Sequence, residues 1–186
     1  MDRRAFLAST VGALAAPLAV EAQPPRRVPR IGALGGPQSP DSPAWAGFRQ
    51  GLRELGWEEG RNLVLEFRFA GAWDERYGEL AGELVRLKVD VLVTHNSQAA
   101  RAAKEATSTI PIVMYAVAYP VEAGFVASLA RPGGNVTGVS NQLGDLMGKY
   151  LDLLREIAPG MRRVALLWDP NNLSSALGLK EVEVLA

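Results

Sequence analysis

Cysteine is absent from this 186-residue sequence, and histidine occurs only once, at His95. The lack of cysteine excludes disulfides, thiolate metal ligands, cysteine nucleophiles and a lipid-modified cysteine. A single histidine cannot supply a multi-histidine metal site, and a Ser-His-Asp triad would have to be built around that one residue. We therefore expect no metal site, no cofactor and no catalytic residue, and an enzyme is disfavoured.

The sequence also has no excess of charge of either sign. It carries 20 basic and 20 acidic residues, with no long run of lysine or arginine. Duplex nucleic acids and anionic membrane surfaces are recognised through a basic patch or stripe, so nucleic acid is not an expected partner. The 48% of hydrophobic and 22% of charged residues are typical of a soluble globular protein.

The first 22 residues differ in composition from the rest. Arg3 and Arg4 precede an apolar run over residues 5–20, and the segment closes on Ala22. This layout is typical of a signal peptide, and the run is too short and too rich in alanine to favour a retained membrane anchor. We expect export to the periplasm with cleavage after Ala22. The paired arginines resemble a twin-arginine signal, and that route and general secretion both stay open.

From residue 30 onward, short apolar runs alternate with amphipathic stretches, after a proline-rich segment (residues 23–29) that is expected to be extended. The alternating pattern of residues 63–69 indicates a strand toward a sheet edge. Alternation at these lengths predicts a doubly wound α/β lobe over residues 30–140, with a parallel five-stranded sheet covered on both faces. The predicted strands are residues 30–34, 63–69, 89–93, 112–115 and 136–140. Three predicted helices begin at Ser42, Asp74 and Ser97, and a fourth spans residues 121–130.

The remaining residues, 141–186, begin a second pattern of the same kind. A helix is predicted up to Ile157, then a strand over residues 163–168 and a helix opening near Ser174. These 46 residues are too few for an independent α/β domain, so we expect the truncated start of a second lobe. Apolar side chains on this orphan segment are expected to be exposed; they include Leu154, Ile157, Leu166 and Trp168.

Several stretches occur in an order that is specific to one family. They are Arg-Ile-Gly at 30–32, Phe-Arg-Gln-Gly-Leu-Arg-Glu-Leu-Gly at 48–56, Glu-Leu-Val-Arg-Leu-Lys-Val-Asp at 83–90, Thr-Ile-Pro-Ile-Val at 109–113 and Leu-Ala-Arg-Pro-Gly-Gly-Asn-Val-Thr-Gly at 129–138. In them the sequence resembles the substrate-binding proteins of bacterial ABC importers that share the type I periplasmic-binding-protein fold. It departs from the family pattern at residues 94–97 and 119–120, on the side where the ligand is expected, so the resemblance does not specify the ligand.

The resemblance implies two lobes that close on a small-molecule solute, such as an amino acid, and deliver it to an ABC permease in the inner membrane. It also implies a monomer when the protein is full length, and weak or undetectable solute binding by the present chain, which holds one complete wall. A solute-sensing receptor that docks on a signalling protein is the alternative. A Rossmann-like enzyme is least favoured, because residues 32–37 lack the second and third glycines of the dinucleotide-binding motif.

Ligands of open parallel sheets bind beyond the carboxyl ends of the strands. Asn96 and Ser97 also suit plain helix capping, His95 also suits a structural role, and Tyr115 suits either the core or a stacking contact. The link of Asp169 to the ligand rests mainly on the resemblance. The predicted ligand-binding residues are Gln38, Ser39, His95, Asn96, Ser97, Val117, Tyr119, Asn141 and Asp169.

Overall fold

The structure is a computed structural model that describes residues 27–71, 75–141, 143–170 and 172–185. The predicted signal peptide and its cleavage site lie outside the described residues. So does Asp74, which we expected to cap a helix; the described helix α3 (Arg76–Arg86) is preceded by Glu75 at its N-cap.

One parallel sheet of five strands forms the centre of the first lobe. Its order is β2-β1-β3-β4-β5, and every neighbouring pair is parallel. Strand β2 lies at one edge, as its alternating sequence predicted. The strands are β1 (Arg30–Gly35), β2 (Val64–Phe69), β3 (Val91–His95), β4 (Ile112–Val117) and β5 (Val136–Ser140). This confirms the doubly wound α/β lobe.

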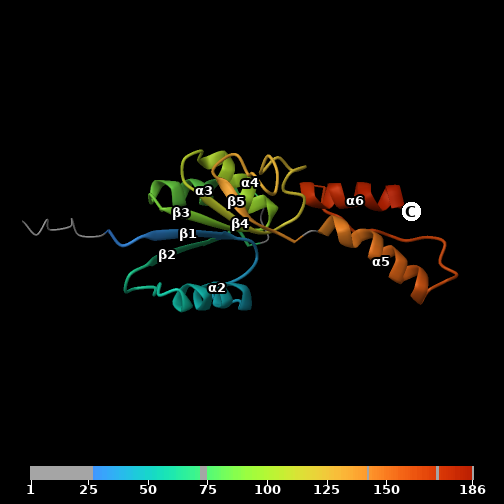
Figure 1. The fold of residues 1–186 in the computed structure, drawn as a ribbon, viewed down its shortest axis with the longest axis horizontal. Coiled ribbons are helices and arrows are strands. Elements are labelled where there is room, and N and C mark those ends of the chain that lie inside the picture. The colour runs from blue at the N-terminus through green and yellow to red at the C-terminus, as the bar shows by residue number, and fades with distance from the viewer. Residues whose placement is uncertain (1–26, 72–74, 142, 171, 186) are drawn as a thin grey trace, which may run out of the picture.

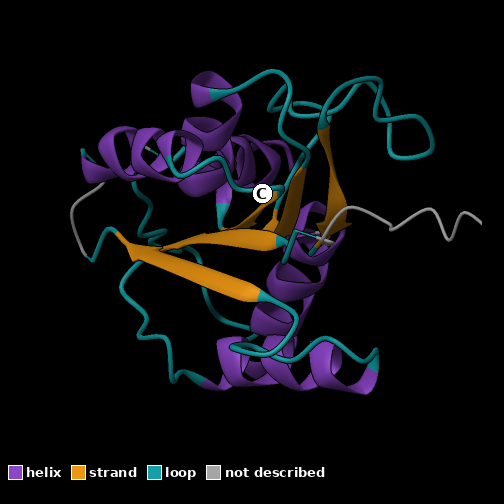
Figure 2. Ribbon diagram, turned by 90° about the vertical axis from the view of Figure 1, so that its left-hand side faces the viewer, coloured by secondary structure: helices purple, strands orange, loops and turns teal. Residues whose placement is uncertain are grey.

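Helices cover both faces of this sheet, as Figure 2 shows. On one face, α2 (Pro43–Glu54) buries Trp45 completely against Ala33 and Val93. On the other face, α3 packs beside α4 (Ser97–Ala106), whose buried alanines let it approach the sheet closely. Proline at the first position of α2 suits its start, because the N–H that proline lacks has no partner there in any helix.

The junction of β4 and β5 requires a glycine. Gly138 has a φ of +143°, and a Cβ atom on it would lie 1.9 Å from the carbonyl oxygen of Met114. The register of the two strands shifts between Met114 and Val117, so the backbones approach each other closely at this irregularity. Only a residue without a side chain fits this position.

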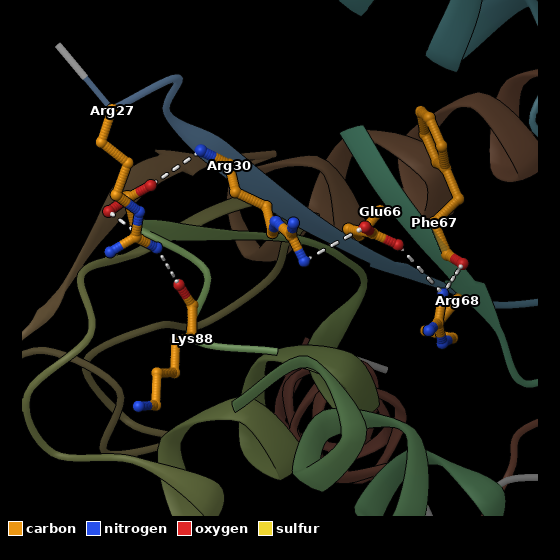
Figure 3. A network of polar contacts seen from close by, with 7 residues as sticks. Arg27, Arg30, Glu66, Phe67, Arg68 and Lys88 are labelled. Atoms are coloured by element: carbon orange, nitrogen blue, oxygen red, sulfur yellow. Dashed lines mark hydrogen bonds and ion pairs between the residues drawn. The ribbon is translucent and has the colours of Figure 1, made fainter. Parts of the chain in front are cut away.

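Ion pairs and charge-assisted hydrogen bonds hold strand β2, at the edge of the sheet, and its neighbour β1 in place (Figure 3). Arg68 of β2 lies 2.7 Å from Glu83 of α3, and Arg30 of β1 lies 3.5 Å from Glu66 of β2. The backbone N–H of Arg30 also donates to Asp90, at 2.7 Å, in the loop before β3. These contacts join β1 and β2 to each other, to α3 and to the loop before β3.

The helix predicted over residues 121–130 is not formed. The chain makes one turn, in which the N–H of Ala123 donates to the carbonyl of Tyr119, and then Gly124 takes a φ of +72°. A left-handed residue cannot continue a right-handed helix, so the turn ends there. Phe125 and Val126, which follow the turn, are both buried against the core.

The strand predicted over residues 163–168 was also wrong. These residues form no strand in the structure, and the side chain of Leu167 is fully exposed. A strand exists only through the hydrogen bonds of a neighbour, and no described strand lies beside this segment.

The segment instead connects α5 (Leu143–Ile157) to α6 (Leu173–Leu185), which lie side by side beyond the sheet in Figure 1. Several apolar side chains of this region are exposed, as we expected. The expected ones are Leu154, Ile157, Leu166 and Trp168.

Candidate functional site

The carboxyl ends of β1, β3 and β4 bring three polar side chains together. His95 is the last residue of β3 and pairs in register with Tyr115 of β4. Their rings lie 4.7 Å apart, between centroids. Gln38, in the loop after β1, places its Nε2 3.4 Å from Nε2 of His95. The ring of Trp45 stands edge-on to Tyr115, with the centroids 5.7 Å apart, and covers the cluster on the α2 side.

This cluster contains buried polar atoms that have no hydrogen-bond partner within the described residues. They are Oε1 of Gln38, Nδ1 of His95, the hydroxyl of Tyr115, Nε1 of Trp45 and Oγ of Ser42. Most buried polar groups in native proteins are paired, because an unpaired one costs free energy. These unpaired donors and acceptors mark the carboxyl ends of the strands as the candidate site for a polar solute.

The cluster is also electrically neutral near pH 7. Burial lowers the pKa of His95 below its usual value and raises the pKa of Tyr115, because both rings lose hydration of their charged forms. When Nε2 of His95 accepts from the amide of Gln38, the ring proton resides on Nδ1, which becomes the unpaired donor. The site therefore offers hydrogen bonds rather than a full charge.

Asn96 and Ser97 stand at the start of α4, next to this cluster. Asn96 caps the helix, since its Oδ1 accepts from the N–H of Ala99 at 2.8 Å, and its Nδ2 donates to the hydroxyl of Tyr77. Both ends of its side chain are thus engaged, so the capping role is confirmed. Ser97 is buried, and its hydroxyl lies 2.7 Å from the hydroxyl of Ser174 in α6.

Three of the four non-glycine residues with a positive φ among the described residues lie near the carboxyl ends of β3 and β4, and the fourth, Lys88, precedes β3. Asn96, Ala116 and Tyr119 have φ values of +91°, +55° and +52°. Residues other than glycine rarely adopt such values, and they persist where surrounding structure enforces them, often at binding sites. The strain follows β3 and β4 at the point where the predicted solute-binding residues lie.

The other predicted residues are placed differently. Ser39 is exposed, and Val117 is fully buried in the core, so its side chain packs rather than faces a ligand. The carbonyl of Val117 accepts from the N–H of Asn141, which brings the end of β5 to the end of β4. Asp169 lies in the turn before α6, where its carbonyl accepts from the N–H of Asn172.

Sequence reasoning missed part of this cluster. Trp45 was not among the predicted ligand-binding residues, and it is completely buried in the core, whereas Ser42 was predicted only as a helix start. Both carry a buried unpaired polar atom at the site. The available signal was their position at the start of α2, directly after the loop that follows β1, since helix starts and strand ends share one edge of a parallel sheet.

Tyr119 takes part in a second polar contact. Its hydroxyl donates to Oε2 of Glu181 in α6 at 2.8 Å. Tyr119 and Glu122 face Leu177 and Glu181 across a pocket of about 450 Å³. Helix α6 therefore covers part of the region beyond the carboxyl ends of β3 and β4, where the candidate site lies.

Two negative findings concern the described residues alone. No helix among them combines the length and apolarity that crossing a membrane requires. Within the same residues, His, Asp and Glu side chains form no group of three or more that would suit a metal ion.

Residues 41–186 match the sequence model of a family described as ABC transporter substrate binding protein. The chain belongs to this family. A tyrosine-binding protein of Clostridioides difficile (strain R20291) is 34% identical over 131 residues, which are 70% of this chain and 37% of that protein. The family is one of substrate-binding proteins rather than of enzymes, which fits the expectation that the chain is not an enzyme.

Solved structures agree with this family assignment. A conserved domain protein from Vibrio cholerae superposes with a TM-score of 0.76 at 29% identity, over 86% of this chain and 54% of that one. A Streptococcus pneumonia ABC domain in complex with L-Trp has a TM-score of 0.75 at 24% identity, over 85% and 53%, and shows the shared fold. The chain thus spans about half the length of these structures.

Proposed function

We propose that this protein is the solute-binding component of an ABC importer, exported to the periplasm, and that its solute is an amino acid with an aromatic side chain. The observation that carries the proposal is the set of unpaired polar atoms of Gln38, His95 and Tyr115 at the carboxyl edge of the sheet. Family membership supports a substrate-binding role, and delivery to a permease completes the proposal.

The chemistry of the cluster favours an amino acid over a sugar phosphate or a metal. A free amino acid carries a carboxylate that accepts hydrogen bonds and an ammonium group that donates them. In the tautomer whose Nε2 accepts from Gln38, Nδ1 of His95 is a donor for the carboxylate, and Oε1 of Gln38 is an acceptor for the ammonium group. The ring of Tyr115, which is only partly buried, gives the site aromatic surface, and the completely buried ring of Trp45 supports it from behind. The tyrosine-binding relative supports the same solute class.

We further propose that residues 141–186 are the start of the second lobe. Ligand-driven closure of two lobes is a hinge motion in which the solute binds both walls. Asn141, hydrogen-bonded to Val117 where β5 ends, would be the crossover between the lobes. In this proposal Asp169, in the turn before α6, belongs to the second wall.

The single histidine makes a direct test possible, because one imidazole signal reports the site by NMR. L-Tyrosine, L-phenylalanine and L-tryptophan are titrated into the chain, with D-phenylalanine and glucose as controls. We expect the L-amino acids to shift the His95 signal with millimolar affinity, and the controls to leave it unchanged. Gln38→Ala should weaken binding about tenfold, whereas Gln50→Ala, on the exposed side of α2, should not.

An unchanged His95 signal with every L-amino acid would contradict the proposed solute class. The importer role has a separate test: a strain that lacks the gene should lose uptake of the same radiolabelled amino acid, and the intact gene should restore it. Uptake that is unaffected by the deletion would contradict the transport role while leaving solute binding intact.

A further inference from the structure

Helix α6 contacts the candidate site through one of its faces. Ser174, Gly178 and Glu181 follow one another at intervals of four and three residues, so they share that face. Ser174 is 7% exposed although it is the second residue of the helix. The face is directed toward the carboxyl ends of β3 and β4, since its partners are Ser97 and residues 118–119.

The hydroxyl of Ser174 completes a directed chain of hydrogen bonds. It donates to the carbonyl oxygen of Ala118 at 3.2 Å, so its single proton is used. The hydroxyl of Ser97, 2.7 Å away, must then be the donor to Oγ of Ser174. Ser174 thereby pairs with one donor of the first lobe, the hydroxyl of Ser97, and with one acceptor, the carbonyl of Ala118.

A second contact lies about two helical turns further along α6. Tyr119, in its strained conformation, donates to Glu181 at 2.8 Å. Gly178 lies between the two contacts, and a Cβ atom on it would be 3.6 Å from the hydroxyl of Tyr119. A methyl group would fit there, but a larger side chain would push α6 away from Tyr119.

We propose that α6 is an internal latch, which holds the solute-binding edge through Ser174 and Glu181 and which a solute must displace. This inference rests on the proposed function, because the displaced contacts belong to the candidate site. A binding-competent state that is only partly populated lowers the apparent affinity by its fraction. Releasing the latch should therefore tighten solute binding, and locking it should weaken binding.

The latch can be locked because the chain has no cysteine of its own. In Ser97→Cys/Ser174→Cys the two sulfurs replace hydroxyls that are 2.7 Å apart, which suits a disulfide. The matched control is Ser97→Cys/Ser175→Cys, whose second cysteine is turned about 100° around the helix. We expect mild oxidation to cross-link the first pair at least tenfold faster than the control, measured by peptide mapping without reduction.

Solute affinity is then measured for the oxidised and the reduced forms of the first pair. We expect the oxidised form to bind L-phenylalanine at least tenfold more weakly, and reduction to restore binding. Ser174→Ala/Glu181→Ala, which keeps good helix formers, should bind severalfold more tightly than the unmodified chain. Gly178→Leu should have the same effect without removing a polar group.

Equal cross-linking of the two cysteine pairs would overturn the latch, and so would equal or tighter solute binding by the oxidised form. If no solute binds either form, the proposed function fails, and the contact of α6 is still decided by the cross-linking rates. The two proposals are therefore tested separately.

Discussion

Residues 30–140 and residues 143–185 contain similar local signals, yet they differ in how they are built. In the first lobe, every predicted strand has a parallel neighbour, and the side chains between sheet and helices are buried. In the second region, an apolar run of the same kind, residues 163–168, has no neighbour and leaves Leu167 fully exposed. The difference shows that a strand signal specifies a structure only where adjacent strands supply hydrogen bonds.

The two regions differ most in the burial of their tryptophans. Trp45 is completely buried and contacts four aromatic rings, whereas Trp168 is 41% exposed. We expect Trp45→Ala to lower the free energy of unfolding by about 3–5 kcal/mol. Trp168→Ala should change it by less than about 1 kcal/mol. Urea unfolding followed by circular dichroism measures both, and equal losses would remove the distinction between the regions.

Glycine replacements test the strand pairing itself. Gly138→Ala introduces a Cβ atom 1.9 Å from the carbonyl of Met114, at a φ of +143°. We expect a loss of about 3 kcal/mol, because strain and clash both act on the pairing of β4 with β5. Gly134→Ala is the control, since nothing lies within 4 Å of its added Cβ, and it should change stability by less than about 0.5 kcal/mol. Thermal unfolding of the two variants measures both losses of stability, and equal losses would contradict the pairing of β4 with β5 at Gly138.

The N-cap residues of α4 and α6 allow the same comparison of the two regions, with smaller expected losses of stability. Asn96 accepts from Ala99 at the start of α4, and Asn172 accepts from Ser174 at the start of α6. Asn96→Ala should lower the stability of the main unfolding transition by about 1–2 kcal/mol. Asn172→Ala should leave that transition almost unchanged and reduce only the helical signal. A large shift of the main transition in Asn172→Ala would show that α6 unfolds together with the first lobe.

The smallest expected effect is a pH dependence that arises in the first lobe alone. The pKa of His95 in the folded protein lies below the unfolded value of 6.5, because burial disfavours the charged ring. Between those two values the unfolded chain binds more protons, so stability falls as the pH drops below 6.5. His95→Gln should flatten this part of the profile, as the chain has no other histidine. Urea unfolding at pH 8, 6.5 and 5 measures the change, and an unaltered slope in the variant would contradict the assignment.

The candidate site was predicted in part. Gln38 and His95 were identified because the carboxyl ends of parallel strands meet at one edge, which is a property of topology and follows from strand order along the chain. The contributions of Trp45 and Ser42 were missed, since their unpaired polar atoms depend on how deeply α2 packs against the sheet. Val117 was predicted to bind ligand, but the irregularity between β4 and β5 lies at this residue, and its side chain is fully buried in the core.

By itself, the sequence determined the alternation of strands and helices in the first lobe, its parallel sheet and the edge at which a site forms. These follow from apolar periodicity and from turn residues, which act over a few positions of the chain. Only the tertiary structure decided that Gly124 ends the turn after Tyr119, that residues 163–168 form no strand, and that α6 lies against Ser97. Each of these depends on what is available nearby in space: a pairing strand, a surface to cover, or a hydrogen-bond partner 77 residues away in the chain.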